Sequence, residues 1–307
     1  MRSESRSMVL LAVVLSHVAL PGISNAESSV ESNVIYEMHS GLALLMDVHY
    51  PDIANGYGIV FIPGSGWTAP MSPDAVPLKR GMNRTHLGGQ ALLEAGYTVF
   101  SINHRAAPNH FYPAPVEDAQ RAVRFVRYNA ARFRINPDRI GALGGSSGGQ
   151  LALLLAVMDN EGQLDDPSEV NRVSAKVQTV AALYPSTDFV RIARSGSPYT
   201  DLFQHRLTNQ HLERNPDSEE ERIYRAASPI SYVTDDDPPV LLIHGDQDTI
   251  VPFSQSEVFK EALEQENVDV ELIRMPGGGH GMSIVSGPDS PDYFGPLVDW
   301  FDRYLKN

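Results

Sequence analysis

The chain contains no cysteine, which excludes disulfide bonds, thiolate metal ligands, a cysteine nucleophile and lipid attachment through a cysteine. Basic residues are also in the minority, because 24 lysines and arginines stand against 38 aspartates and glutamates, and the formal net charge is −14. An acidic surface repels nucleic acid and anionic membranes, so we expect neither as a partner. With 307 residues, the chain is long enough to form a core without covalent cross-links.

The chain also lacks an apolar run of the roughly 20 residues that a membrane-spanning helix needs. Its N-terminal run, residues 8–20, is shorter, follows two arginines and precedes the small-residue site that ends at Ala26. This order is typical of a secretory signal peptide and predicts cleavage after Ala26. We therefore expect residues 27–307 to form an exported protein, periplasmic or extracellular, with no stable membrane anchor.

Short apolar runs alternate with helical patterns along the chain. This alternation predicts an α/β fold whose mostly parallel, eight-stranded sheet has helices on both faces. The strands are expected at residues 34–38, 44–50, 58–62, 98–103, 140–143, 179–184, 240–244 and 268–275. Helices are expected at residues 115–133, 151–158, 257–264 and 293–305.

Two segments interrupt this alternation. Residues 64–89 contain three prolines among small and polar residues, which predicts a long loop rather than a helix or strand. Residues 189–229 are strongly charged and predict a small, lid-like helical insertion over the sheet. The rest of 27–307 is expected to form a single catalytic domain.

A glycine-rich turn follows the fifth predicted strand, with the sequence Gly-Gly-Ser-Ser-Gly-Gly at residues 144–149. Its glycines have the wrong spacing for a dinucleotide-binding turn, and a phosphate loop would need lysine where Gln150 stands. The turn does fit a nucleophile elbow, in which a serine occupies a strained turn between strand and helix. Both Ser146 and Ser147 satisfy the glycine spacing, and Ser146 lies nearer the strand end.

A serine becomes a strong nucleophile only when a base takes its proton. His280 follows the last predicted strand in a glycine-rich loop, and Asp248 follows the strand before it. The order serine, aspartate, histidine is the one that this type of fold uses, so we predict Ser146 as nucleophile, His280 as base and Asp248 as the acid that orients it. Asp246 remains an alternative acid.

A tetrahedral intermediate also needs N–H donors for its oxyanion, normally from the elbow and from the loop after the third strand. We assign these donors to the backbone of Ser65, Gly66 and Ser147. The other histidines lack the spacing and the acidic neighbours of a metal site, so we predict neither a metal nor a cofactor.

These motifs resemble the α/β-hydrolase superfamily, and within it the esterases grouped with hormone-sensitive lipase and the bacterial feruloyl-esterase-like enzymes. The resemblance also covers residues 63–67, 103–108, 113–118, 136–140 and 227–230. In that family the serine of Gly-Gly-Ser-Ala-Gly-Gly is the nucleophile, which corresponds to Ser146, and the alanine after it corresponds to Ser147. The family usually has His-Gly-Gly-Gly in the oxyanion loop, where this chain has Pro63-Gly64-Ser65-Gly66.

The resemblance implies a secreted serine carboxylester hydrolase that forms an acyl-enzyme. It implies a small-molecule or carbohydrate ester as substrate, such as acetyl or feruloyl groups on polysaccharides. One alternative is a peptidase of the prolyl-oligopeptidase type, although the chain has no room for the propeller domain of those enzymes. Another alternative is a non-catalytic binding protein with the same fold, which only the altered oxyanion loop favours.

Overall fold

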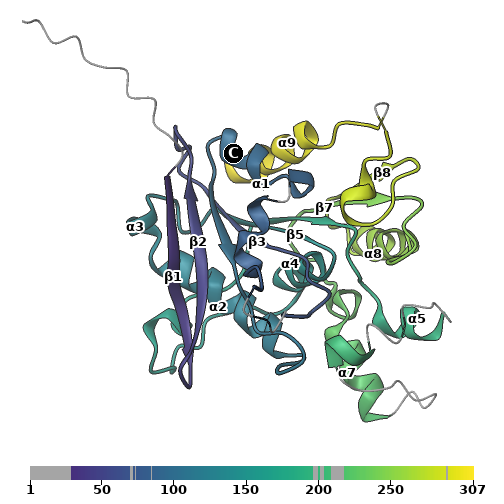
Figure 1. Cartoon of the computed structure of the whole chain (residues 1–307), viewed down its shortest axis with the longest axis horizontal. Coiled ribbons are helices and arrows are strands. Elements are labelled where there is room, and N and C mark those ends of the chain that lie inside the picture. The colour runs from purple at the N-terminus through teal and green to yellow at the C-terminus, as the bar shows by residue number, and fades with distance from the viewer. Residues whose placement is uncertain are drawn as a thin grey trace, which may run out of the picture.

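Within the residues described by the computed structural model, eight strands form a sheet in the order β1-β2-β4-β3-β5-β6-β7-β8 (Figure 1). The first two pairings, β1 with β2 and β2 with β4, are antiparallel, and the remaining neighbours are parallel. The predicted fold class is therefore confirmed. The strands are β1 (Ser29–His39), β2 (Leu42–Tyr50), β3 (Gly58–Ile62), β4 (Thr98–Ile102), β5 (Ile140–Gly145), β6 (Thr179–Leu183), β7 (Val240–Gly245) and β8 (Val270–Met275).

The structure describes residues 29–69, 72, 74–83, 85–195, 200, 204–208, 218–287 and 290–307. The predicted signal peptide, residues 1–26, lies outside this part of the chain. No helix in the described part combines the length and the apolar character needed to cross a bilayer.

The central strands are mostly apolar because both faces of the sheet are covered, and their few polar side chains, such as Thr98, Thr179 and His244, are buried. Every residue of β3, β4, β5, β6 and β7 is buried, as expected for parallel strands between two helical layers. The edge strand β1 instead has mostly exposed or partly exposed residues. Continuous and interrupted apolar runs therefore distinguish central from edge strands in this sequence.

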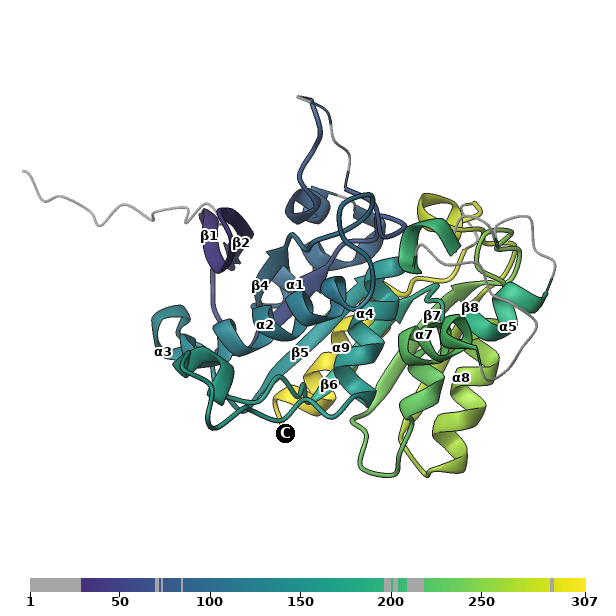
Figure 2. The same cartoon turned by 90° about the horizontal axis from the view of Figure 1, so that it is seen from below.

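The helices form two layers. On one face, α2 (Ala114–Tyr128), α4 (Ser147–Val157) and α8 (Ser254–Gln265) contribute to one buried cluster with the sheet (Figure 2). On the other face, α1 (Gly89–Glu94) and α9 (Phe294–Leu305) lie side by side and contribute to a second cluster (Figure 1). The sheet therefore lies between two buried clusters.

Two predictions about local structure are wrong. The helix expected at residues 115–133 is divided into α2 and α3 (Ala130–Phe133). The side chain of the intervening Asn129 donates from Nδ2 to the carbonyl of Phe125 at 2.8 Å, and such a local hydrogen bond competes with continuation of the helix.

The second difference is in the loop expected at residues 64–89, which contains the 3₁₀ helices η1 (Leu78–Asn83) and η2 (Thr85–Leu87). Buried Lys79 anchors η1 through an ion pair of 2.5 Å with Asp47, a tertiary contact that local sequence does not reveal.

The insertion at residues 189–229 is helical in its described part, which contains α5 (Phe189–Arg194), the π-helical turn η4 (Gln204–Thr208) and α7 (Glu219–Ala227). A 3₁₀ turn, η5 (Pro229–Tyr232), follows it. Two further 3₁₀ turns are η3 (Glu169–Arg172) and η6 (Gly281–Ile284). In Figure 1, α5 and α7 extend beyond the sheet, in green. A third buried cluster joins this insertion to the loops after β3 and β7 through Trp67, Leu207 and Val251.

Candidate active site

The three predicted catalytic side chains lie at the carboxyl ends of three strands. Ser146 follows β5, Asp248 follows β7 and His280 follows β8. His280 Nε2 lies 2.9 Å from Ser146 Oγ, and His280 Nδ1 lies 2.6 Å from Asp248 Oδ2. Residues that are up to 134 positions apart in sequence therefore form one continuous chain of hydrogen bonds.

The turn around Ser146 explains its glycines. Ser146 has φ 55° and ψ −124°, a strained conformation at the junction of β5 and α4. A Cβ at Gly144 would lie 2.2 Å from the carbonyl oxygen of Gly148, and a Cβ at Gly148 would lie 2.0 Å from that of Ile62. The backbone can close so tightly only without these side chains. Of the two candidate serines, the structure places Ser146 against His280.

The two candidate acids have different surroundings. Asp246 accepts hydrogen bonds from Arg274 Nε at 2.9 Å and from the N–H of Gly277 at 2.8 Å, so its carboxylate belongs to the turn after β8. Asp248 is buried and bonds His280. Burial raises the pKa of Asp248, but hydrogen bonds from His244 and His280 outweigh it, and the net pKa lies well below its usual range.

His244, the penultimate residue of β7, is a partner of this acid that the sequence reasoning missed. The ring is fully buried, and its Nε2 lies 3.3 Å from Asp248 Oδ2 and 3.0 Å from the carbonyl oxygen of Val251. Its Nδ1 lies 2.7 Å from Ser256 Oγ. A proton on Nε2 satisfies all three contacts, because Nε2 then donates and Nδ1 accepts from the hydroxyl. The signal in the sequence is a histidine at the strand end, four residues before the acid.

The predicted oxyanion residues also lie together, but with an unexpected contact. The N–H groups of Ser65 and Gly66 both donate to Ser147 Oγ, at 2.9 and 3.0 Å. The hydroxyl of Ser147 therefore accepts hydrogen bonds from the two N–H groups that the sequence predicts as donors to the oxyanion. The loop packs closely against the elbow, since a Cβ at Gly64 would lie 2.4 Å from the carbonyl oxygen of Gly145.

The oxyanion loop is held in place by Trp67. This side chain is buried, and its Nε1 donates to Gln150 Oε1 at 3.0 Å. Gln150 in turn donates from Nε2 to the carbonyl of Ala227 at 2.8 Å, which joins α4 to the end of the insertion. The N–H of Ala107 donates to the carbonyl of Trp67 at 2.8 Å. Gln150, the residue that distinguishes the elbow from a phosphate loop, thus stabilises the oxyanion loop through its hydrogen bond with Trp67.

A cavity of about 330 Å³ opens in front of Ser146. Besides the elbow and the oxyanion loop, it is lined by His86, Leu87, Tyr184 and Met282. The ring of Tyr184 packs on that of His280 with centroids 4.7 Å apart. Among the described residues, no group of three or more histidine, aspartate and glutamate side chains is arranged to hold a metal ion.

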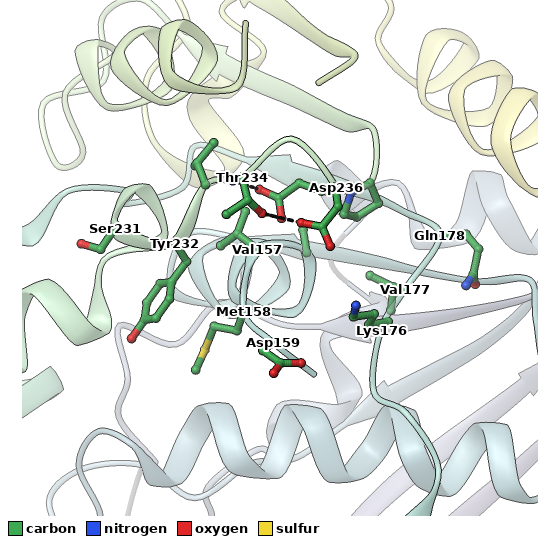
Figure 3. Close-up of a pocket in the computed structure, with 14 residues that line it drawn as sticks. Val157, Met158, Asp159, Lys176, Val177, Gln178, Ser231, Tyr232, Thr234 and Asp236 are labelled. Carbon is green, nitrogen blue, oxygen red and sulfur yellow. Dashed lines mark hydrogen bonds between the residues drawn. The ribbon is translucent and has the colours of Figure 1, made fainter. Parts of the chain in front are cut away.

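A larger cavity, of about 580 Å³, lies at the opposite edge of the sheet (Figure 3). It is lined by the end of α4 and by the segments that enter β6 and β7, including Met158, Lys176 and Tyr232. Thr234 Oγ1 donates to Asp236 Oδ1 at 2.7 Å, and the Thr234 N–H donates to Asp237 Oδ2 at 2.9 Å. None of the residues predicted to be catalytic lines this cavity.

Comparisons with known proteins agree with this architecture. Esterase LipQ of Mycobacterium tuberculosis is 30% identical over 273 residues, which are 87% of this chain and 61% of LipQ. Esterase LipC of the same bacterium is 28% identical over 75% of this chain and 54% of its own length. The chain therefore spans about half to three fifths of these curated relatives.

Two solved structures have the same fold. The truncated form of a carbohydrate esterase from gut microbiota is 27% identical, with a TM-score of 0.72, and the match covers 91% of this chain and 97% of that one. An acetyl ester-xyloside bifunctional hydrolase from Caldicellulosiruptor lactoaceticus is 24% identical, also with a TM-score of 0.72, over 89% of this chain and 96% of that one. The family model described as BD-FAE matches residues 46–263. Because this match covers more than half of the sequence, the chain belongs to the BD-FAE family, and its resemblance to the α/β-hydrolase esterases is confirmed.

Proposed function

We propose that this protein is a serine carboxylester hydrolase that acts through Ser146, His280 and Asp248. The observation that carries the proposal is the unbroken contact from Asp248 Oδ2 through the His280 ring to Ser146 Oγ, at 2.6 and 2.9 Å, beside an open cavity. The esterase names of the M. tuberculosis relatives support the same reaction class.

In the first half-reaction, Ser146 Oγ attacks the acyl carbon while His280 Nε2 takes the serine proton. The tetrahedral intermediate collapses as the bond to the alcohol oxygen breaks, and His280 returns the proton to that oxygen. Water then attacks the acyl-enzyme with the same base, so that the acid and free Ser146 are released. Asp248 remains a carboxylate throughout, because its pKa is lowered, and it stabilises the imidazolium that forms in each half.

The intermediate's oxyanion receives hydrogen bonds from the backbone N–H groups of Ser65, Gly66 and Ser147. In the substrate-free enzyme, the first two groups donate to Ser147 Oγ. The oxyanion therefore competes with a neutral hydroxyl for these donors. A negatively charged oxygen is the stronger acceptor and displaces the hydroxyl, but the hydrogen bonds lost to Ser147 Oγ reduce the net stabilisation of the intermediate.

An acylated carbohydrate is the substrate class we favour. The gut-microbiota structure with 27% identity is described as a carbohydrate esterase, and it aligns over nearly the whole of both chains. The cavity beside Ser146 is open to solvent on the side of the exposed Met282, which suits an ester at the surface of a larger saccharide.

Hydrolysis of p-nitrophenyl acetate by the purified protein tests the reaction class. We expect turnover that Ser146→Ala reduces by at least about 10⁴-fold, and labelling by a fluorophosphonate probe that the same substitution removes. Turnover of a p-nitroanilide instead of the ester would favour the peptidase alternative. An unlabelled wild-type protein without esterase activity would favour the binding-protein alternative.

Secretion is a further part of the proposal. It depends on the N-terminal pattern of two arginines, a short apolar run and the small residues before Glu27. Mass spectrometry of the exported protein should give a chain that begins at Glu27, and a chain that retains Met1 would contradict the predicted cleavage.

A further inference from the structure

An arginine of the insertion lies against the oxyanion loop. Arg206, on η4, has its Nη1 3.3 Å from the position that a Cβ of Gly66 would occupy. Gly66 has no side chain and a φ of 61°, so the guanidinium approaches the loop backbone directly. Gly66 also lines the cavity in front of Ser146. The positive charge of Arg206 therefore lies against a residue that lines this cavity, at the rim rather than in the lining itself.

The backbone that carries this arginine is anchored to the body of the protein. The next residue, Leu207, is buried in the cluster that contains Trp67. The carbonyl of Leu207 accepts a hydrogen bond of 2.8 Å from the N–H of Tyr112. Arg206 itself is only partly exposed. Its position next to Gly66 thus follows from packing on the same tryptophan that holds the oxyanion loop.

The charge of Arg206 has no counterpart within the described residues. Of the other arginines on α5 and α7, Arg194 and Arg225 pair with the fully buried carboxylate of Glu221, whereas Arg191 and Arg222 are exposed to solvent. No ion pair or side-chain hydrogen bond joins the Arg206 guanidinium to a described residue, although acidic side chains outnumber basic ones in the chain. A partly buried guanidinium that pairs with no anion among the described residues has lost part of its hydration without a compensating ion pair there. It therefore favours an anion that arrives with the ligand.

We propose that Arg206 binds a carboxylate on the substrate, so that the preferred ester carries a negative charge in its acyl or its alcohol part, near the scissile bond. The planar guanidinium can donate two parallel N–H bonds to such a group, which fixes its orientation as well as its position. This inference rests on the proposed esterase function and narrows its substrate class.

Two matched pairs of esters test the proposal and distinguish the two parts of the substrate. p-Nitrophenyl propionate and p-nitrophenyl hemisuccinate differ by a carboxylate in the acyl part, whereas phenyl acetate and 4-acetoxybenzoate differ by one in the alcohol part. For at least one pair, Arg206→Gln should lower kcat/KM for the charged ester about 10- to 100-fold, mainly through KM. The neutral ester of the pair should change by less than about twofold, and Arg206→Lys should retain part of the preference.

Arg222→Gln is the matched control, because Arg222 is an exposed arginine on α7 of the same insertion. It should leave both pairs unchanged. An unchanged ratio of charged to neutral ester in Arg206→Gln, for both pairs, would overturn the proposal. An equal loss on charged and neutral esters would also overturn it, since the guanidinium would then serve folding or the common chemistry. If the wild-type protein hydrolyses none of the four esters, the proposed function fails instead.

Discussion

The loops at the two edges of the central sheet, at the carboxyl and the amino ends of its parallel strands, bring different residues together. At the carboxyl edge, short connections after β5, β7 and β8 bring Ser146, Asp248 and His280 into contact around a cavity of about 330 Å³. At the amino edge, a cavity of about 580 Å³ is lined by both polar and apolar side chains, but none of those three residues lines it. In parallel sheets the loops that leave the carboxyl ends converge, so strand direction is a better guide to the candidate active site than cavity volume.

A carboxylate at each edge shows the same difference. Burial raises the pKa of both Asp248 and Asp237. At Asp248, hydrogen bonds from His244, His280 and the N–H of Val251 outweigh burial and lower the pKa. At Asp237, burial outweighs the hydrogen bonds from Thr234 and raises the pKa to about 6. The number and charge of the donors, rather than burial alone, decide which carboxylate stays ionised.

Removing the carboxylate at each edge is the strongest test of this comparison. Asp248→Asn should lower kcat for p-nitrophenyl acetate by about 10⁴-fold, because an amide cannot stabilise the imidazolium of His280 and favours the wrong tautomer. Asp237→Asn, the control at the opposite edge, should leave kcat within about twofold. Steady-state kinetics of the two variants measures the contrast, and comparable losses in both would contradict it.

Loss of the hydrogen bond from His244 to the Asp248 carboxylate should have the next largest effect on kcat. His244→Leu removes a donor to Asp248 Oδ2 at 3.3 Å and should lower kcat about tenfold with little change in KM. His244→Gln keeps an N–H donor and should retain more activity. Two measurements on both variants separate the hydrogen bond to Asp248 from side-chain packing. The first is the dependence of kcat on pH, and the second is the thermal unfolding temperature. Equal losses in both variants, accompanied by equal destabilisation, would leave packing as the explanation.

Ionisation of Asp237 should cost stability rather than activity. Its folded-state pKa of about 6 lies above the usual 3.8, so the folded protein binds the proton more tightly and stability falls as the pH rises from about 4 to 6. With a discount for solvent screening, Asp237→Asn should raise the free energy of unfolding by about 1 kcal/mol at pH 7.5 and leave it unchanged near pH 3.5. Urea unfolding at both pH values provides the measurement. A less stable variant at pH 7.5 would reverse the assigned sign.

The smallest expected effect concerns the Ser147 hydroxyl at the carboxyl edge. Ser147→Ala removes the acceptor that engages the N–H groups of Ser65 and Gly66. These donors are then free for the oxyanion, and kcat should rise about fivefold, as expected for the loss of a competing hydrogen bond of roughly 1 kcal/mol. Single-turnover kinetics with p-nitrophenyl acetate would detect this change. A tenfold fall would instead mean that the hydroxyl holds the loop in its active geometry.

The parts of the fold that were predictable have strong periodic signals. The fully buried strands β3, β5, β6 and β7 are nearly continuous apolar runs, and their order with the intervening helices specifies a parallel sheet. The break at Asn129 and the 3₁₀ helix around Lys79 were not predictable in this way. The first depends on a side-chain bond to Phe125, and the second depends on an ion pair with Asp47 across 32 residues.

The sequence by itself determined the fold class, the elbow and the chain order of serine, aspartate and histidine, because each follows from local composition and from position after a strand. Only the tertiary structure decided between the two serines, paired the acid with His244, turned the Ser147 hydroxyl toward the oxyanion loop and set Arg206 beside Gly66. Each of these depends on where a side chain points after distant segments have packed together. Neighbours in sequence do not specify that direction.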